Sequence, residues 1–347
     1  MNESIILGIE SSCDDTSAAI IVGNKILSNI AANQEIHNLY GGVVPELASR
    51  AHQQNIIPVV KQCISKANIQ QNDIAAIGFT RGPGLLGSLL VGTSFAKSLA
   101  MSLNVPLIEV NHLQAHILAH FIEDANPVPP KFPFLCLTVS GGHTMIVLVK
   151  DYFEMQVIGK TMDDAAGEAF DKIGKILGLD YPAGPIIDRL AKEGNENAFK
   201  FNKPRLENYD YSFSGIKTSV LYFIQKELKK NPDFIKENMN DLCASVQKSI
   251  VEILMEKLQK AAADLGIHEV AIAGGVSANS RLRAAMTENQ EKVGWQIYIP
   301  KFEYTTDNAA MIAMVAKLKF ERGEFADLSV SATARYDLVS ELEQGKG

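Results

Sequence analysis

The sequence of 347 residues lacks several features that mark common classes of protein. Its four cysteines (Cys13, Cys63, Cys136 and Cys243) lie far apart and form no CxxC pair. That spacing excludes a zinc ribbon or a disulfide scaffold and is typical of a reducing compartment. No uninterrupted apolar run approaches the roughly 20 residues of a membrane span, and the first residues contain no basic stretch of a signal peptide. We therefore expect a cytoplasmic protein that has no membrane association.

Positive charge is also scarce, because 33 Lys and Arg stand against 40 Asp and Glu, a net charge of −7. A basic surface over the whole protein is thus excluded, while a local patch for nucleic acid remains open. The chain has no GxxxxGK[ST] phosphate loop and no GxGxxG after its first strand. It also offers no Ser/His/Asp or Cys/His arrangement that predicts a nucleophile.

A strand–polar turn–strand pattern occurs twice and predicts an internal duplication. The first copy is the apolar run 5–10, the turn 11–16 and the run 18–22, and the second is the run 134–139, the turn 140–144 and the run 145–149. Residues 124–133 hold four of the 13 prolines and indicate a linker. We expect an α/β protein with an N-terminal lobe over 1–123, completed by 321–347, and a second lobe over 134–320. The two polar turns would then face a common cleft.

His112 and His116 predict a metal site. On a helix two imidazoles four residues apart share one face, which suits a metal ion. The pair is short, however, and two histidines that merely pack are an equally good interpretation. A zinc protease has Glu directly after the first His, and Leu113 stands there, which disfavours that class.

Asp307 is the best candidate for a third ligand. It lies just before a predicted helix, so a simple N-terminal cap is the alternative interpretation. Two imidazoles and one carboxylate would suit iron, zinc or manganese and would leave positions open for a substrate.

Two glycine-rich turns, 140–144 and 273–279, could hold a phosphate through exposed backbone N–H groups, although either could equally be an ordinary turn. The stretch 163–172 contains four carboxylates, and Glu168 and Asp171 share a helical face. That pair could bind ribose hydroxyls or could simply face solvent. The segment 212–218 could also form a local basic patch, although ordinary solvated surface is the default interpretation, with the following residues: Lys200, Lys203, Arg205, Lys226, Lys229 and Lys230.

Seven motifs occur in one order along almost the whole chain, from about residue 4 to residue 336. They are GIESSCDDT (8–16), GGVVPELASR (41–50), HLQAH (112–116), VSGGHT (139–144), DDAAGEAFDK (163–172), FSG (213–215) and GGVSAN (274–279). In this combination the chain closely resembles the TsaD family, which was once described as O-sialoglycoprotein endopeptidases.

The resemblance implies an actin-like, sugar-kinase-like (ASKHA) fold with a nucleotide cleft. It also implies transfer of a threonylcarbamoyl group from threonylcarbamoyl-AMP to N6 of the adenosine 3′ of the anticodon (position 37), in tRNAs reading ANN codons. AMP leaves, t6A forms, and no covalent protein intermediate is needed. The implied partners are tRNA, a TsaB-like paralogous subunit and a TsaE-like P-loop ATPase. We expect the N-terminal lobe to bind the paralogue.

By motif, the resemblance makes His112, His116 and Asp307 ligands of one divalent ion, with Fe²⁺ expected and Zn²⁺ possible. The matching substrate-binding positions are Thr138, Val139, Ser140, Gly141, Gly142, Asp171, Gly184, Asp188 and Asn279. Asp14 and His143 are the candidates for direct participation in catalysis. Two departures occur, because Asp15 stands where the motif often has Glu, and Ala183 where a second Gly is common.

Two other classes of function remain to be weighed. A metalloprotease is disfavoured by Leu113, and a catalytically silent paralogue of this fold is disfavoured because the full ligand set is present.

Overall fold

The structure is a computed structural model that describes residues 3–32, 34, 37, 40–203 and 206–338. Arg205 of the predicted basic patch and residues 339–347 of the predicted N-terminal lobe lie outside the described residues. The chain forms two units, residues 1–129 with 300–347 (unit 1) and residues 130–299 (unit 2).

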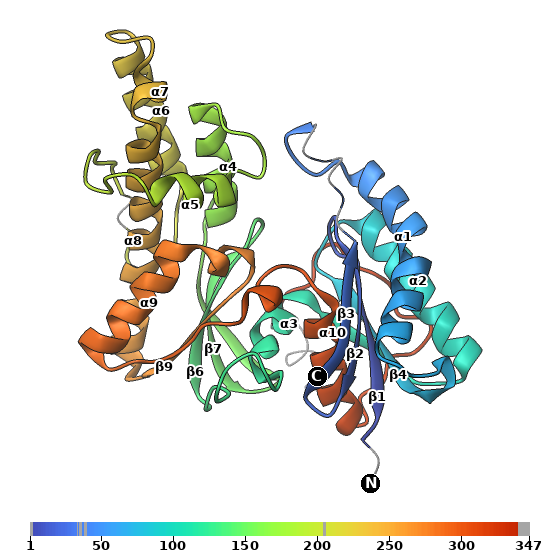
Figure 1. Ribbon diagram of the computed structural model, residues 1–347. Coiled ribbons are helices and arrows are strands. Elements are labelled where there is room, and N and C mark those ends of the chain that lie inside the picture. Colours follow the sequence, from blue (N-terminus) through green and yellow to red (C-terminus); the bar gives the residue numbers. More distant parts are fainter. Residues whose placement is uncertain (1–2, 33, 35–36, 38–39, 204–205, 339–347) are drawn as a thin grey trace. The chain divides into compact units, whose positions relative to one another are not determined.

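Unit 1 contains a five-stranded sheet in the order β3-β2-β1-β4-β5 (Figure 1). Its strands are β1 (Ile5–Glu10), β2 (Thr16–Val22), β3 (Lys25–Ala32), β4 (Ile74–Gly82) and β5 (Leu107–Asn111). Strands β1, β2 and β3 pair antiparallel, and β4 and β5 continue the sheet in parallel from β1. The sequence predicted the first two strands and missed β3, whose polar Ser28 and Asn29 interrupt the apolar pattern.

Helices cover both faces of this sheet. Helix α1 (Pro45–Lys66) contacts β2 and β3, and helix α2 (Leu86–Leu103) contacts β4 and α1. On the other face lies α10 (Ala309–Glu321), which contacts β1, β2, β4 and β5, beside the short α3 (His112–Leu118). Side chains alternate along β1, so Leu7 and Ile9 join the core under α1 while Gly8 faces α10.

Two glycines allow α10 to lie close against the sheet. A Cβ at Gly8 would stand 2.5 Å from the backbone nitrogen of Ala313, and one at Gly78 would stand 2.3 Å from the Cβ of Ala316. Helix α10 therefore belongs to unit 1, so the boundary of the second lobe expected at residue 320 is wrong and lies near residue 300. The following segment also stays on unit 1: Ala326 bridges Leu107, and the Thr333 N–H donates to the Arg81 carbonyl.

Unit 2 repeats the same topology with the order β10-β9-β6-β7-β8. Its strands are β6 (Phe134–Val139), β7 (Thr144–Asp151), β8 (Glu154–Lys160), β9 (Glu269–Ala273) and β10 (Gln296–Tyr298). Here β6, β7 and β8 pair antiparallel, and β9 and β10 extend the sheet in parallel from β6. The duplication predicted from the two strand–turn–strand patterns is therefore confirmed, strand for strand.

Five helices of unit 2 share its main core with the sheet, and a short one, α7 (Phe234–Glu237), lies between α6 and α8. The five are α4 (Ala166–Leu177), α5 (Ala183–Ala191), α6 (Ser214–Leu228), α8 (Met239–Leu265) and α9 (Ser280–Val293). The core brings Leu137 and Ile272 of the sheet together with Ile173 of α4 and Leu254 of α8.

By length and composition alone, α2 could cross a membrane, and it is the single such helix among the described residues. The sequence contains no uninterrupted apolar run here, because serines, a threonine and Lys97 lie among the apolar residues of α2. It packs on β4 and α1, yet only a third of it is buried. One such helix is weak evidence, because core helices of other proteins have the same length and composition.

Candidate functional site

The two histidines of the HxxxH pair lie on one face of α3, directly after strand β5. Asn111, the last residue of β5, caps this helix, because its Oδ1 accepts hydrogen bonds from the N–H groups of Leu113 and Gln114 at 2.9 and 3.2 Å. His112 and His116 are both buried, and their rings meet edge to face with centroids 4.7 Å apart. The helical spacing predicted from sequence is therefore present.

Asp307 comes to the same point from the other end of the chain. Its Oδ1 lies 3.1 Å from Nε2 of His116 and 3.4 Å from Nε2 of His112. The residue that caps α10 is its neighbour Asn308, whose Oδ1 accepts a bond from the Met311 N–H at 3.2 Å. Asp307 thus faces the imidazoles, and the alternative of a simple helix cap does not hold.

These three residues fit a divalent cation. One ligand atom from each lies within 4.8 Å of the others, and the set is buried or half-buried. Ligands about 2.0–2.2 Å from a common Zn²⁺ stand roughly 3 to 3.5 Å from one another, and the two Asp307–imidazole distances fall in that range. In the described part of the chain, the buried Nδ1 of His116 has no hydrogen-bond partner. Two imidazoles and a carboxylate suit iron and zinc alike.

Glu10, which the sequence analysis did not single out, lies behind His112. It ends β1 on the face that carries Gly8 and α10, and it is fully buried. Its Oε2 accepts bonds from the Thr80 hydroxyl at 2.6 Å and from His112 Nδ1 at 3.0 Å, and its Oε1 accepts one from the Ser12 N–H. An acidic residue that ends an otherwise apolar strand is the signal that could have identified it.

The charges of this cluster depend on one another. Burial alone would lower the pKa of His112, but the carboxylates of Asp307 and Glu10 raise it well above its ordinary value. Burial would raise the pKa of both acids, but His112 lowers the pKa of Glu10, and both histidines hold the pKa of Asp307 well below its usual range. Without a cation, a proton on His112 therefore supplies the positive charge between the two carboxylates.

The turn between β1 and β2 carries Asp14, a candidate for catalysis, which is half-buried. Helix α1 supports the turn through His52, whose Nε2 donates to the Cys13 carbonyl at 3.0 Å and whose Nδ1 accepts from the Thr16 hydroxyl at 2.8 Å. Burial lowers the pKa of His52, in keeping with a neutral ring. For Asp15, burial and then the nearby Asp14 raise the pKa to about 7.

None of the four thiols is activated. Burial raises the pKa of Cys13 far above its ordinary value, with a further contribution from Asp14. Burial also raises the pKa of Cys63 and Cys243 to about 11 and that of Cys136 to about 12. All four are free cysteines.

In unit 2 the turn Ser140–His143 joins β6 to β7. The Ser140 N–H donates to the His143 carbonyl at 2.8 Å, and the His143 N–H donates to Ser140 Oγ at 3.1 Å. A Cβ at Gly141 or Gly142 would meet nothing within 4 Å, and neither glycine has the positive φ that L side chains avoid. The protein's own packing therefore does not require glycine at either position.

The other predicted substrate-binding residues have partners within unit 2. Asp171 Oδ1 accepts a bond from the Ala183 N–H at 2.8 Å, where α5 begins, and burial raises its pKa. Asp188 Oδ1 accepts from the N–H of Ser280 at 3.0 Å and from its hydroxyl at 2.7 Å, and it also contacts the Gln247 amide. Asn279 caps α9.

The remaining predicted positions lie at the ends of strands or helices of unit 2. Thr138 and Val139 are fully buried at the end of β6. At Gly184, in the first turn of α5, a Cβ would approach only Phe170, at 3.9 Å.

The acidic stretch 163–172 holds parts of unit 2 together. Asp163 accepts bonds from the Ser212 and Ser214 hydroxyls and from the Phe213 N–H, and these bonds lower its pKa although burial opposes them. Glu168 pairs with Lys172 at 2.7 Å. The FSG motif is thus held at the start of α6 by Asp163.

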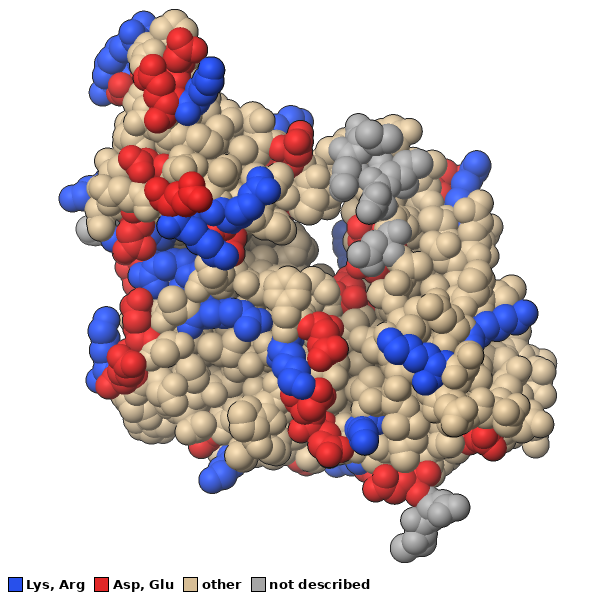
Figure 2. Space-filling model, in the orientation of Figure 1, with Lys and Arg blue, Asp and Glu red and all other residues tan. Residues whose placement is uncertain are grey.

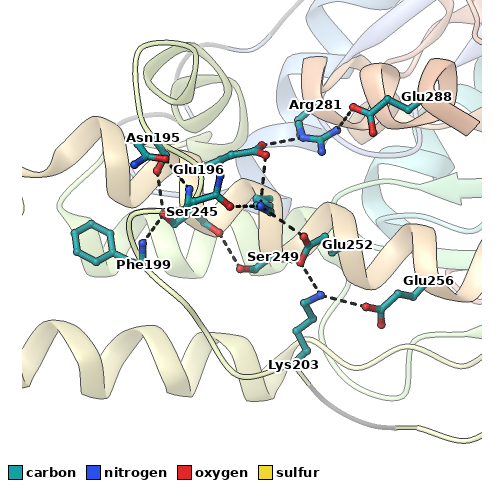
Figure 3. Close-up of polar contacts among 12 residues, drawn as sticks. Asn195, Glu196, Phe199, Lys203, Ser245, Ser249, Glu252, Glu256, Arg281 and Glu288 are labelled. Carbon is teal, nitrogen blue, oxygen red and sulfur yellow. Dashed lines mark hydrogen bonds and ion pairs between the residues drawn. The ribbon is translucent and has the colours of Figure 1, made fainter.

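Two lysines of the predicted basic patch are paired with acidic side chains. Lys203 contacts Glu252 at 2.6 Å and Glu256 at 3.1 Å, and Lys230 contacts Glu227 at 2.8 Å. Figure 3 shows Lys203 within a network that also joins Arg281 to Glu196 and Glu288. On the face of the molecule in Figure 2, basic and acidic side chains lie next to one another over this unit. Two of the six patch residues, Lys203 and Lys230, are therefore engaged with carboxylates, and a nucleic-acid role for the patch stays a prediction.

Comparison with known proteins identifies the family to which this chain is similar. The chain matches the model of the TsaD family, described as tRNA N6-adenosine threonylcarbamoyltransferase, over residues 25–314. A relative of that name from Riemerella anatipestifer is 83% identical over 338 residues, which cover 97% of this chain and 99% of the relative. Another from Christiangramia forsetii is 62% identical and covers 95% of this chain and 97% of the relative.

Two solved structures share the fold at low identity. Full-length HypF in its phosphate- and nucleotide-bound form aligns with a TM-score of 0.63 and 14% identity, over 94% of this chain and 48% of HypF. Component A of the Acidaminococcus fermentans (R)-2-hydroxyglutaryl-CoA dehydratase aligns with a TM-score of 0.50 and 17% identity, over 91% of this chain and 98% of that protein. These likenesses show the ASKHA fold expected from the sequence.

Proposed function

The chain belongs to the TsaD family of tRNA N6-adenosine threonylcarbamoyltransferases, and from this premise we propose how it performs that transfer. The donor is threonylcarbamoyl-AMP, and the acceptor is N6 of adenosine 37, 3′ of the anticodon, in tRNAs reading ANN codons. A C–N bond forms at the carbamoyl carbon, the bond from that carbon to the phosphate oxygen breaks, and the N6 proton is lost. The products are t6A and AMP.

The observation that carries this proposal is the meeting of His112, His116 and Asp307. Asp307 is 191 residues away from His116, yet the three offer ligand atoms within 4.8 Å of one another. A divalent ion, which we propose to be Fe²⁺ with Zn²⁺ as the alternative, would supply Lewis-acid stabilisation of negative charge on the donor. The three side chains hold and orient it from a rigid wall formed by α3 and the start of α10.

Direct attack by the adenosine amine is supported by the cysteine environments. A thiolate is the nucleophilic form, and every cysteine of the chain has a pKa raised by burial. An exocyclic adenine amine is a weak nucleophile, so the main contribution of the protein is to position it next to the carbamoyl carbon. Asp14 and His143 are the candidates for accepting the N6 proton.

The nucleotide half of the donor is proposed to lie at the Ser140–Gly142 turn. Both glycines leave room at the Cβ position, so backbone N–H groups can approach a phosphate closely. Thr138, Val139 and Gly184 would border this site, and Asp171, Asp188 and Asn279 would contribute through the loops and helix starts that they already hold.

We assign α1 and α2 as the surface for a TsaB-like paralogous subunit. Exposed apolar side chains gather on these helices, among them Ile57, Leu86, Leu90 and Met101, each about half or more exposed. The surface over α1 and α2 has few charged side chains in Figure 2. A TsaE-like ATPase and a separate enzyme that makes the adenylate complete the proposed system, which we place in the cytoplasm because free thiols suit a reducing compartment.

The decisive experiment is reconstitution. The purified chain, its two partner proteins, threonylcarbamoyl-AMP and a tRNA with adenosine at position 37 are combined, and the digested tRNA is analysed by mass spectrometry for t6A. A tRNA with guanosine at position 37 is the matched control, and a relative of known activity verifies the reagents. Unmodified adenosine with this chain, alongside modification by the relative, would disprove the proposal.

A further inference from the structure

Glu10 is a fully buried carboxylate that none of the roles assigned above uses. A buried carboxylate is costly unless it is paired and hydrogen-bonded. Glu10 accepts bonds from the Ser12 N–H, the Thr80 hydroxyl and His112 Nδ1, and among the described residues the His112 ring is its only partner that can bear a positive charge. The residue is therefore held on two sides by neutral donors and aimed at one histidine.

The contact with Glu10 sets the tautomer and the ring orientation of His112. A carboxylate only accepts hydrogen bonds, so the 3.0 Å contact places a proton on Nδ1 of His112. The opposite ring nitrogen, Nε2, then faces Asp307 at 3.4 Å. Because an imidazole that ligates a metal must offer an unprotonated nitrogen, the proton on Nδ1 leaves Nε2 as the ligand atom.

We propose that Glu10 is a positioning residue of the metal centre, which holds His112 in the tautomer and orientation that direct Nε2 to a divalent cation. Glu10 also balances charge, because Glu10 and Asp307 together supply two negative charges against a divalent ion. The inference rests on the proposed metal-dependent function and deepens it.

The arrangement distinguishes Glu10 from its neighbours. His116 has no such support, because its Nδ1 is buried without a hydrogen-bond partner in the described part of the chain. Ser12 Oγ also lies near His112 Nδ1, at 3.2 Å, and Thr80 shares the oxygen that contacts His112. If the cluster served only to hold the end of β1, removing either hydroxyl would matter as much as removing the charge of Glu10.

The test compares Glu10→Gln with Ser12→Ala and Thr80→Val in the full-length chain, stripped of metal and titrated with Co²⁺ against a competing chelator. The readouts are the Co²⁺ dissociation constant, the visible absorption bands of bound Co²⁺ and the thermal midpoint of the metal-free protein. We expect Glu10→Gln to weaken Co²⁺ binding by about 10- to 100-fold and to alter the bands. Ser12→Ala and Thr80→Val should change affinity less than about threefold.

Unchanged Co²⁺ affinity and an unchanged spectrum in Glu10→Gln would overturn the proposal, as would an equal loss in all three variants. A second measurement needs no variant. In the Zn²⁺-loaded wild-type protein with ¹⁵N-labelled histidine, His112 should show a protonated Nδ1 and a metal-bound Nε2. The reverse assignment, or absence of metal binding by the wild type, would also overturn it.

The outcomes separate this inference from the proposed function. If the wild type binds Co²⁺ and Glu10→Gln binds it equally well, the role of Glu10 is wrong and the transferase proposal stands. If Glu10→Gln loses affinity as expected but the reconstituted wild type forms no t6A, the role of Glu10 stands and the proposed function fails.

Discussion

A substitution at Gly142 offers the sharpest test of the phosphate site, because a side chain at this position should affect phosphate binding without affecting the stability of the fold. A Cβ at this position meets no protein atom within 4 Å, and the backbone φ lies outside the left-handed region. Replacing a glycine under those conditions changes stability by about 0.4–1 kcal/mol, in the stabilising direction, since it restricts the unfolded chain. Gly142→Val should therefore fold as well as the wild type.

Binding should respond differently. If the turn donates a backbone hydrogen bond to a phosphate, a valine side chain would occupy the space the phosphate needs. Losing one hydrogen bond to a charged group costs about 1.5–3 kcal/mol, which corresponds to a rise in dissociation constant of roughly 10- to 150-fold. Gly142→Ala should show a smaller effect in the same direction.

The assay is calorimetric titration with AMP, run beside a thermal melt of each variant. Gly215→Val is the matched control, because a Cβ there also meets nothing within 4 Å, and it should leave AMP binding unchanged. Gly274→Val is the control for structural damage: its φ is +85° and its Cβ would lie 2.5 Å from the Val139 carbonyl oxygen, so it should lower the thermal midpoint. Unchanged AMP affinity in Gly142→Val would refute the reasoning and leave an ordinary tight turn.

Four further predictions follow from other parts of the structure. His116→Ala should lose bound metal and transfer activity together. Full metal occupancy of this variant by elemental analysis would show that His116 is not a ligand and only packs in the core. Gly8→Ala should lower the free energy of unfolding by about 1–3 kcal/mol in a urea titration, because overpacking costs that much and its Cβ would stand 2.5 Å from the Ala313 nitrogen; equal stability would mean that α10 can move away. In metal-free protein, the raised pKa of Asp15, about 7, means that the folded state holds this proton more tightly than the unfolded state, so the contribution of Asp15 to stability declines as pH rises from about 4 to 7. Asp15→Asn should remove that decline, and parallel pH–stability curves of the two proteins would contradict the assignment. Leu90→Glu, on the exposed face of α2, should abolish complex formation with the TsaB-like subunit in gel filtration at an unchanged thermal midpoint, while a complex that survives would place the partner elsewhere.

The amino-acid sequence by itself determined the features that depend on short spacing. The strand–turn–strand patterns were visible because apolar runs and polar turns are local, and they gave the first hairpin of each sheet. The HxxxH pair was readable because four residues make one helical turn, and the structure places both rings on one face of α3. Strand β3 was missed because its polar residues interrupt the apolar pattern on which that prediction relied.

The tertiary structure decided which distant residues meet. Asp307 precedes a helix, so the sequence allowed either a helix cap or a metal ligand. The packing of α10 against Gly8 and Gly78 decided between them. In the fold Asn308 caps the helix, and Asp307 faces the histidines. In the sequence Glu10 is marked only as an acidic residue at the end of an apolar strand, and its contacts with Ser12, Thr80 and His112 are made by the fold. Lys203, one of the lysines expected to form a basic patch, is paired with Glu252 and Glu256 of α8, some 50 residues away. Burial and charge pairing are properties of contacts between distant segments, so only the folded chain determines them.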